Sequence, residues 1–317
     1  MCRRRKVNTK DLLSISDLSP DDIGRLLSDA VELKARGWNN SLSGKTLALV
    51  FEKPSLRTRV SFELAMKQMD GEALYLSPAE VGLGKREPVA DVARVLSRFV
   101  DVIACRTFGH ETLVQLAKYA DIPVINALSD LEHPCQALAD ILTIYEKKGD
   151  LKGLSLAYIG DGNNCANSLL LACAMTGINC RLASPKGYLV DKDLFARAEA
   201  YAEDSGAELY SGTDLKTALR GADVIYTDVW TSMGQEAETE KRLKDFTGFQ
   251  VNAKLVSMAK KDAIIMHPLP AHYGEEVDRE ILECPQSVIF DQAENRLHAQ
   301  KAVLRDMLGG LEIGGRH

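Results

Sequence analysis

The segment after the apolar run at 46–51 carries residue types that suit a small anion. Ser55, Arg57 and Thr58 stand close together where a helix is expected to begin. The free N–H groups of a helix start attract an anion, hydroxyl groups add donors, and the fork of an arginine matches the geometry of a phosphate. The structural alternative is that Ser55 only caps the helix and that the arginines face solvent. Taken alone, this segment supports both interpretations about equally.

Two more groups of polar residues follow expected strands. Arg106 ends the apolar run at 101–107. His133 and Gln136 lie in the turn after the apolar run at 123–128. Because ligands of open α/β sheets bind at the carboxyl ends of parallel strands, these side chains are expected at the same edge as the first segment. An arginine or a histidine alone is more often structural, but three polar turns on one edge favour a site that holds an anion and donates to a carbonyl oxygen.

The elements that would position these turns alternate along the chain. Short apolar runs separated by amphipathic stretches predict βαβ units around parallel sheets. We expect strands at 46–51, 73–77, 101–107, 123–128, 154–161, 180–185, 223–230, 263–270 and 288–293. We expect helices that start at Pro20 and near His133, and helices over 59–69, 89–100, 111–120, 167–177, 191–205 and 293–308.

The predicted fold is α/β, with two doubly wound parallel-sheet domains. A break near Gly149–Gly153 predicts the boundary between them. Residues 1–148 are expected to form the first domain and residues 149–292 the second. A C-terminal helix at 293–310 is expected to return and pack back on the first domain.

The overall composition excludes several classes of protein. The 39 basic and 45 acidic residues give a net charge of −6, which argues against nucleic acid as a partner. The seven cysteines are scattered without CxxC spacing, so a disulfide framework or a zinc site is not expected. The basic start is followed by no apolar run, and no stretch approaches the ~20 apolar residues of a membrane span. We therefore expect a cytoplasmic protein without a metal or cofactor and without a membrane partner.

These residues resemble the transcarbamoylase family. SLRTR at 55–59 is similar to the family's carbamoyl phosphate signature Ser-Thr-Arg-Thr-Arg, and EHPCQ at 132–136 to its His-Pro-x-Gln turn. Arg106 is similar to the family's carbamoyl-binding arginine. The resemblance extends over nearly the whole chain, in order and with matching spacing, and it implies an enzyme that transfers a carbamoyl group.

The resemblance also implies residue roles for the first substrate. Arg57, Arg106, His133 and Pro268 are implied as catalytic residues. Donors aimed at the carbamoyl oxygen stabilise the negative charge that develops there when an amine attacks. Gln136 would orient the carbamoyl amine. The implied site for carbamoyl phosphate comprises Ser55, Leu56, Arg57, Thr58, Arg106, His133, Pro134, Cys135, Gln136, Pro268, Leu269 and Arg296.

The second half resembles the ornithine-specific members of the family. DVWTSMGQE at 228–236 is similar to their D-x-x-x-S-M-G loop, and GDGNN at 160–164 to their GDxxNN turn. The ornithine-binding residues implied are Asn164, Asp228, Ser232 and Met233. The Asp228 carboxylate would accept from the α-ammonium of ornithine and would repel the extra carboxylate of aspartate.

Three positions depart from the family pattern. Pro268 stands where ornithine enzymes usually have a cysteine, and it lacks an N–H, so only its carbonyl can contact a ligand. Leu56 replaces the usual threonine, which removes a hydroxyl. Gly82 replaces a glutamine that in many relatives reaches a neighbouring subunit's site; nearby Lys85 or Arg86 could supply charge instead.

The sequence thus predicts transfer of a carbamoyl group from carbamoyl phosphate to the δ-amine of L-ornithine. The resemblance implies a homotrimer, or a multiple of trimers, that serves arginine biosynthesis. The alternatives are another acceptor (putrescine, an acylated ornithine or aspartate) or a non-catalytic relative that only binds ligands. A nicotinamide-dependent dehydrogenase is remote, because it rests on a GxG motif in which Cys165 occupies the third glycine position.

Overall fold

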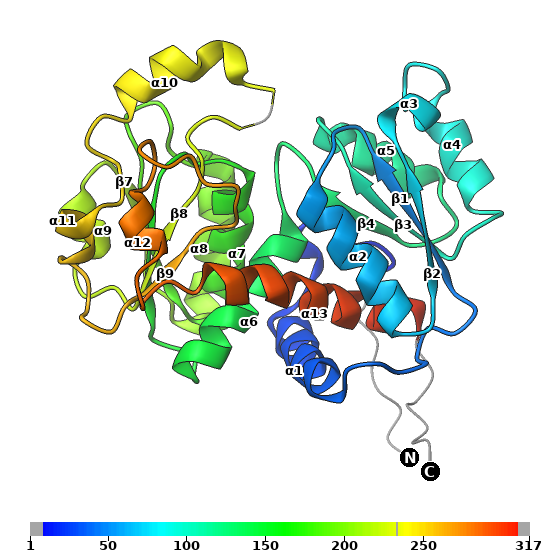
Figure 1. Cartoon of the computed structure of the whole chain (residues 1–317), viewed down its shortest axis with the longest axis horizontal. Helices are drawn as coiled ribbons and strands as arrows, with labels where there is room; N and C mark the ends of the chain where they lie inside the picture. Colours follow the sequence, from blue (N-terminus) through cyan, green and yellow to red (C-terminus); the bar gives the residue numbers. More distant parts are fainter. Residues whose placement is uncertain (1–8, 233, 310–317) are drawn as a thin grey trace. The chain divides into compact units, whose positions relative to one another are not determined.

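A computed structural model describes residues 9–232 and 234–309 of the chain (Figure 1). The chain forms two compact units. Unit 1 extends to Ala139 and resumes at Asn295, and unit 2 is Asp140–Glu294. The chain passes into unit 2 inside helix α6 (Pro134–Lys148) and returns inside helix α13 (Ile289–Leu308).

Unit 1 is built on a parallel sheet with the strand order β2-β1-β3-β4. Its strands are β1 (Thr46–Phe51), β2 (Glu72–Leu76), β3 (Val102–Arg106) and β4 (Val124–Leu128). Its other described elements, besides parts of α6 and α13, are η1 (Ile15–Asp17), α1 (Pro20–Arg36), α2 (Leu56–Gln68), α3 (Pro78–Val81), α4 (Val89–Leu96) and α5 (His110–Tyr119).

Both faces of this sheet are buried, as expected for a doubly wound fold. Ala48 and Val50 of β1 lie in a core cluster with side chains of α4 and α5. The alternate residues Leu47, Leu49 and Phe51 point to the other face and are also buried. Strands buried on both faces require apolar residues throughout, which explains the unbroken apolar run at 46–51.

Local signals in the sequence set where the helices begin. Ser19 caps α1: its hydroxyl accepts from the N–H of Asp22 at 3.1 Å, and the Asp22 carboxylate accepts from the N–H of Ser19 at 2.9 Å. This is the reciprocal capping box, with Pro20 at the first helical position. In α3, Gly82 adopts a φ of 53° at the C-terminal end, and a Cβ there would lie 2.8 Å from the Cβ of Arg86. The glycine at 82 therefore fits the backbone that this short helix needs.

Unit 2 is built on a second parallel sheet with the order β7-β6-β5-β8-β9. Its strands are β5 (Ser155–Ile159), β6 (Asn179–Ala183), β7 (Leu209–Gly212), β8 (Val224–Thr227) and β9 (Ile264–Met266). Its other described elements are α7 (Asn164–Thr176), α8 (Lys192–Ser205), α9 (Leu215–Leu219), η2 (Glu236–Glu238), α10 (Thr239–Asp245), α11 (Ala253–Val256) and α12 (Arg279–Leu282).

Helices also cover both faces of the second sheet (Figure 1). Ala157 and Ile159 of β5 share a core cluster with residues of α9, α11 and α12. On the opposite face, Tyr158 of β5 stacks on Tyr226 of β8, with 5.7 Å between the ring centroids. Helix α7 is buried almost all round, from Cys165 to Met175, as a helix between layers must be.

The expected fold is confirmed, including the return of the C-terminal helix to the first unit. From Asn295 onward α13 belongs to unit 1. There Arg305 forms an ion pair with Asp29 of α1 at 2.7 Å. Within the described part of the chain, we find no helix of the length and apolarity that a bilayer crossing demands.

One expected strand is wrong and one strand was not expected. From Ile289 onward this segment is the start of α13, and the N–H of Gln292 donates to the carbonyl of Val288 at 2.8 Å. Ile289, Gln292 and Arg296 are buried while Phe290 is 76% exposed, which is helical rather than alternating spacing. Strand β7 lies at the sheet edge and is only half-buried, so its short sequence LYSG lacks the apolar run that marks the other strands.

A buried lysine makes the stability of unit 1 depend on pH. Lys301 of α13 is buried, and its Nζ donates to the carbonyl of Gly37 at 3.1 Å. Burial lowers the pKa of Lys301 from 10.5 to about 8. Between these values the unfolded chain binds more protons than the folded protein, so this group makes the folded state more stable as the pH rises through that window.

We therefore expect Lys301→Met to remove part of this rise. The methionine fills a similar space without an ammonium. Thermal unfolding midpoints of wild type and variant, measured from about pH 7.5 to 10, should converge as the pH increases, with the variant the more stable at the lower end. Lys67→Met, which removes an exposed ammonium of α2, controls for net charge. A constant difference between wild type and Lys301→Met across the window would contradict this assignment.

Candidate functional site

Both sheets change the direction of their strand order beside the residues expected to bind substrate. In unit 1, β1 lies between β2 and β3; in unit 2, β5 lies between β6 and β8. Ligands of open α/β sheets bind outside the carboxyl ends of the strands at such a switch point. The turn after β1 leads to Ser55, and the turn after β5 leads to Asn163 and Asn164. Each unit thus presents one of the expected segments at its switch point.

The start of α2 is joined to α13 through a buried hydroxyl. Ser55 caps α2: its Oγ accepts from the N–H of Thr58 at 3.3 Å and donates to the Thr58 Oγ1 at 3.0 Å. Thr58 is fully buried, and its Oγ1 also accepts from the Nη2 of Arg296 at 2.9 Å. Ser55 therefore caps α2. Capping alone would not require the guanidinium of Arg296 at the Thr58 hydroxyl, so that contact indicates a role beyond capping.

Positive side chains gather around His133 in unit 1. Arg106, His133 and Arg296 are at most 5% exposed, and Lys53 is 8% exposed. Burial lowers the pKa of His133 well below its usual value, and the charges of Arg296, Arg106 and Lys53 lower it further. The imidazole is therefore neutral near pH 7. Burying several cations together is costly, and an anionic ligand offsets that cost, so this cation cluster suits a small anion.

Lys53 is the member of this cluster that the sequence analysis did not single out. It lies directly in the segment after β1, and its Nζ is 4.8 Å from the centroid of the Phe108 ring. The attraction between a cation and the face of an aromatic ring helps to fix the position of the Lys53 ammonium. A charged residue two positions beyond an apolar strand, in the same turn as Ser55, was the available signal.

The remaining expected residues of unit 1 differ in what their side chains can offer. Leu56 is 75% exposed, so only its main chain faces the cap of α2. The Sγ of Cys135 contacts the carbonyl of Asn126 at 3.7 Å, and burial raises the pKa of this thiol to about 12. Cys135 is therefore a protonated core residue. Pro134 opens α6, and Gln136 is 1% exposed in its first turn.

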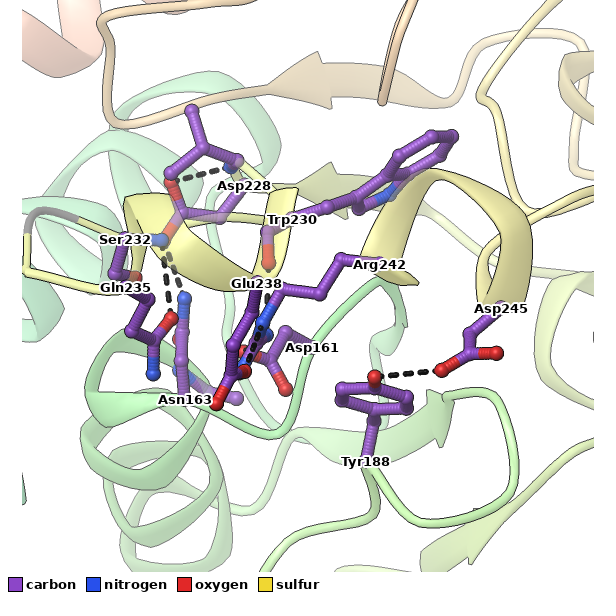
Figure 2. A network of polar contacts seen from close by, with 12 residues as sticks. Asp161, Asn163, Tyr188, Asp228, Trp230, Ser232, Gln235, Glu238, Arg242 and Asp245 are labelled. Carbon is purple, nitrogen blue, oxygen red and sulfur yellow. Dashed lines mark hydrogen bonds and ion pairs between the residues drawn. The ribbon is translucent and has the colours of Figure 1, made fainter. Parts of the chain in front are cut away.

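In unit 2 the structure brings the turns after β5 and β8 together (Figure 2). The Nδ2 of Asn163 donates to the Oδ2 of Asp228 at 2.8 Å, and the Oδ1 of Asp228 accepts from the N–H of Val229 at 2.8 Å. The Asn163 Oδ1 accepts from the N–H groups of Cys165 and Ala166, which fixes the direction of its amide. Asn163 is thus both the N-cap of α7 and the neighbour of Asp228.

Asn164, the asparagine expected to bind ornithine, directly follows Asn163. Asn164 is the first residue of α7, and its Oδ1 accepts from the N–H of Cys165 at 3.0 Å. In the loop after β8, the N–H of Ser232 donates to the Oε1 of Gln235 at 3.1 Å. Met233 lies outside the described residues.

The turn after β9 holds Pro268 and Leu269. The Nδ1 of His267 accepts from the N–H of Leu269 at 2.9 Å, so Nε2 carries the ring proton and donates to the Oε1 of Glu276 at 3.0 Å. His267 and Glu276 are fully buried, and Leu269 adopts a φ of 57°, uncommon for a residue with a side chain. Buried hydrogen bonds therefore hold this turn beside β8, the strand that leads to Asp228.

One group of side chains in the described part of the chain has spacing suited to a metal ion. Ligand atoms of His272, Glu275 and Glu276 lie within 4.8 Å of one another. The Glu276 Oε1, however, accepts from His267 and from the N–H of His272 at 2.6 Å. This group is thus engaged in shaping the turn after β9.

Known proteins resemble this chain over nearly its whole length. Residues 10–146 match the carbamoyl-P binding domain of the aspartate/ornithine carbamoyltransferases, and residues 152–307 match their Asp/Orn binding domain. The ornithine carbamoyltransferase of Bacillus subtilis is 56% identical over 299 residues, which is 94% of this chain and 94% of that protein. That of Pyrococcus abyssi is 51% identical over 311 residues, 96% of this chain and 98% of that one.

A solved structure gives the same result. The ornithine carbamoyltransferase from Pyrococcus furiosus has a TM-score of 0.93 and 50% sequence identity, covering 97% of this chain and 100% of that one. Both the sequence and the fold therefore agree with one family over both units. The chain belongs to the aspartate/ornithine carbamoyltransferase family.

Proposed function

We propose that the protein transfers the carbamoyl group of carbamoyl phosphate to the δ-amine of L-ornithine, giving L-citrulline and phosphate. The observation that carries the proposal is the carboxylate of Asp228. It is held by Asn163 at the switch point of the second sheet and opens a D-x-x-x-S-M-G loop. Similarity to proteins named ornithine carbamoyltransferase, at more than half identity, supports the same acceptor.

In this proposal residues 1–148, with the returning helix at 293–310, bind carbamoyl phosphate, and residues 149–292 bind ornithine. The phosphate rests on the main-chain N–H groups at Ser55, Leu56, Arg57 and Thr58, where the start of α2 offers unsatisfied donors. The guanidinium groups of Arg57 and Arg296 add charge. The position of Arg296 beside Thr58 supports this role.

The carbamoyl group meets donors of the cation cluster. The δ-amine attacks the carbonyl carbon and a C–N bond forms. The C–O bond to phosphate breaks, phosphate leaves with the electron pair, and the proton that the amine loses passes to the leaving phosphate. Arg106, Thr58 and neutral His133 donate to the oxygen as its negative charge develops. Gln136 and the main chain at Pro134 and Cys135 orient the carbamoyl amine.

Ornithine recognition falls to unit 2. Asp228 accepts from the α-ammonium, while Asn164, Ser232 and the main chain of Met233 complete the contacts with the amino-acid end. The carbonyl of Pro268 and the main chain of Leu269 line the reacting end. Because Pro268 has no thiol, only positioning by the main chain remains for this residue.

We further propose that the protein acts in the cytoplasm, in arginine biosynthesis, as a homotrimer or a multiple of trimers. The family resemblance supports this assembly. Sedimentation equilibrium should then give a mass three times, or a multiple of three times, the 34.8 kDa of one chain. A monomer or dimer at micromolar concentration would contradict it.

The acceptor is tested by a panel of amines. With carbamoyl phosphate present, L-ornithine should be carbamoylated at least ~100-fold more efficiently than putrescine, N-acetylornithine or L-aspartate, because a site built around a buried polar pair discriminates strongly against ligands that leave it unsatisfied. The measurement is kcat/KM from carbamoylated product. A preference for any of the other three would replace the proposed acceptor, and absence of product from all four amines would favour the non-catalytic alternative.

The phosphate site is tested by Arg57→Ala. Loss of a charge-assisted contact should raise the KM for carbamoyl phosphate roughly 10- to 100-fold or more. Arg59→Ala is the matched control, since Arg59 lies two residues away, is exposed and forms an ion pair with Glu63 at 2.9 Å. The assignment predicts that only the first variant loses affinity; similar kinetics of the two variants would argue against it.

The acceptor site is tested by Asp228→Asn. The amide keeps the shape of the side chain but not its charge, so the KM for ornithine should rise roughly 10- to 100-fold while binding of carbamoyl phosphate changes little. Asp245→Asn provides a control in the same unit, where the carboxylate accepts from Tyr188 at 2.7 Å. Unchanged ornithine kinetics in Asp228→Asn would remove Asp228 from the site.

A further inference from the structure

A buried arginine lies beside the proposed acceptor site (Figure 2). Arg242 of α10 is 6% exposed. Its Nη1 donates to the Oδ2 of Asp161 at 2.7 Å and to the carbonyl of Trp230 at 2.8 Å, and its Nε donates to the Oε2 of Glu238 at 2.9 Å. One guanidinium thus has three acceptors from three different segments.

Two of these acceptors belong to the turns that carry the proposed site. Asp161 follows β5 and stands two residues before Asn163. Trp230 follows β8 and stands two residues after Asp228. The Arg242 bonds therefore tie together the same two turns that meet in the Asn163–Asp228 hydrogen bond. The Asn163–Asp228 hydrogen bond joins the two turns directly, and the guanidinium of Arg242 joins them through Asp161 and Trp230.

Packing fixes the guanidinium itself. Its central carbon lies 5.0 Å from the centroid of the Tyr188 ring. The Tyr188 ring contacts Phe246 at 4.8 Å, and Phe246 stacks on Trp230 at 5.2 Å, measured between centroids. An arginine placed over an aromatic ring and bonded at both Nη1 and Nε has little freedom to rotate. Arg242 is therefore a rigid link and not a mobile surface charge.

The turn after β5 is equally constrained. The N–H of Gly162 donates to the carbonyl of Tyr188 at 2.8 Å. A Cβ at Gly162 would lie 2.5 Å from the main-chain nitrogen of Val190. The turn is thus packed closely against the segment that also carries the Tyr188 ring, over which the guanidinium of Arg242 lies.

Charge gives the guanidinium a second effect. Burial raises the pKa of Asp161, the positive charge of Arg242 lowers it, and the negative charges of Asp228 and Glu238 raise it. Asp161 and Asp228 therefore repel each other across the two turns. Arg242 binds Asp161 and leaves the carboxylate of Asp228 to Asn163 and to a ligand.

We infer that Arg242 is a positioning residue for the acceptor amino acid: it holds the turns after β5 and β8 so that Asn163 and Asp228 present a fixed carboxylate to the α-ammonium. The inference rests on the proposed function, because it assigns a role within the same acceptor site. Arg242 touches no substrate in this scheme and acts through Asp161 and Trp230. An arginine is needed because a lysine offers a single nitrogen and cannot replace donors at both Nη1 and Nε.

The test compares two substitutions of Arg242 with a control. Arg242→Gln should raise the KM for ornithine roughly 10- to 100-fold, with the dissociation constant of carbamoyl phosphate within about twofold of wild type. Arg242→Lys keeps the charge and should give an intermediate KM. Glu238→Gln should remain near wild type, because the Glu238 side chain is 54% exposed and a glutamine oxygen can still accept from Nε.

A role limited to stability would give a different pattern. Arg242→Gln would then lower the unfolding temperature or the fraction of active protein, and so kcat, at an unchanged KM for ornithine; that result would overturn the inference. If Arg242→Gln does not fold, Arg242→Lys and Asp161→Asn carry the same test, since Asp161 is the partner through which Arg242 acts. Unchanged ornithine KM in both would also overturn it.

A double-mutant cycle identifies the route. If Arg242 works through Asp161, combining Arg242→Gln with Asp161→Asn should cost far less kcat/KM for ornithine than the product of the two single effects. Fully multiplicative effects would overturn the inference. Failure of the proposed function is distinguishable, because wild type would then form no citrulline. This inference fails with an active wild type, either when the Arg242 variants share its ornithine KM or when the two single effects multiply.

Discussion

The direction of the parallel strands is the constraint on which the rest of this structure depends. Because every strand within a sheet runs the same way, each delivers the residues that follow it to one edge. In unit 1 the turns after β1 and β4 and the end of β3 contribute Ser55, Arg106 and His133. In unit 2 the turns after β5, β8 and β9 do the same for Asn163, Asp228 and Pro268. Segments far apart in sequence thereby converge without any of them being long.

Much of the fold was predictable because the central strands are buried on both faces and several helices begin with side-chain caps. The run at 46–51 and the Ser19–Pro20 start are unambiguous for this reason. The predictions of secondary structure failed where the local sequence pattern is compatible with more than one kind of element. Val288, Ile289 and Phe290 suit a strand locally, and only tertiary packing makes them the start of α13. The edge strand β7 buries too little surface to leave an apolar run.

The candidate site could be proposed from the sequence to a similar depth. The residues expected to bind substrate follow strands, and they could be named from their spacing and from the family resemblance. The side chains that position those residues could not be identified from the sequence. Arg242 reaches Asp161 across 81 positions, and Arg296 reaches Thr58 across 238, so no local pattern announces either contact. Which of Asn163 and Asn164 contacts Asp228 likewise depends on which amide caps α7, a property of the backbone rather than of composition.

The two units collect opposite charges, and this bears on how binding is driven. In unit 1, burial lowers the pKa of His133, and the charges of Arg296, Arg106 and Lys53 lower it further, so an anion bound among these cations would be stabilised by their charge. In unit 2, Asp161 and Asp228 repel each other despite Arg242, and in the proposed site the ammonium of the acceptor would relieve that repulsion. A substrate then gains affinity from neutralising charge that folding has already buried. In the proposed site, an acceptor carrying a second carboxylate, or lacking an α-ammonium, would forgo that gain, so electrostatics would contribute to the choice of acceptor.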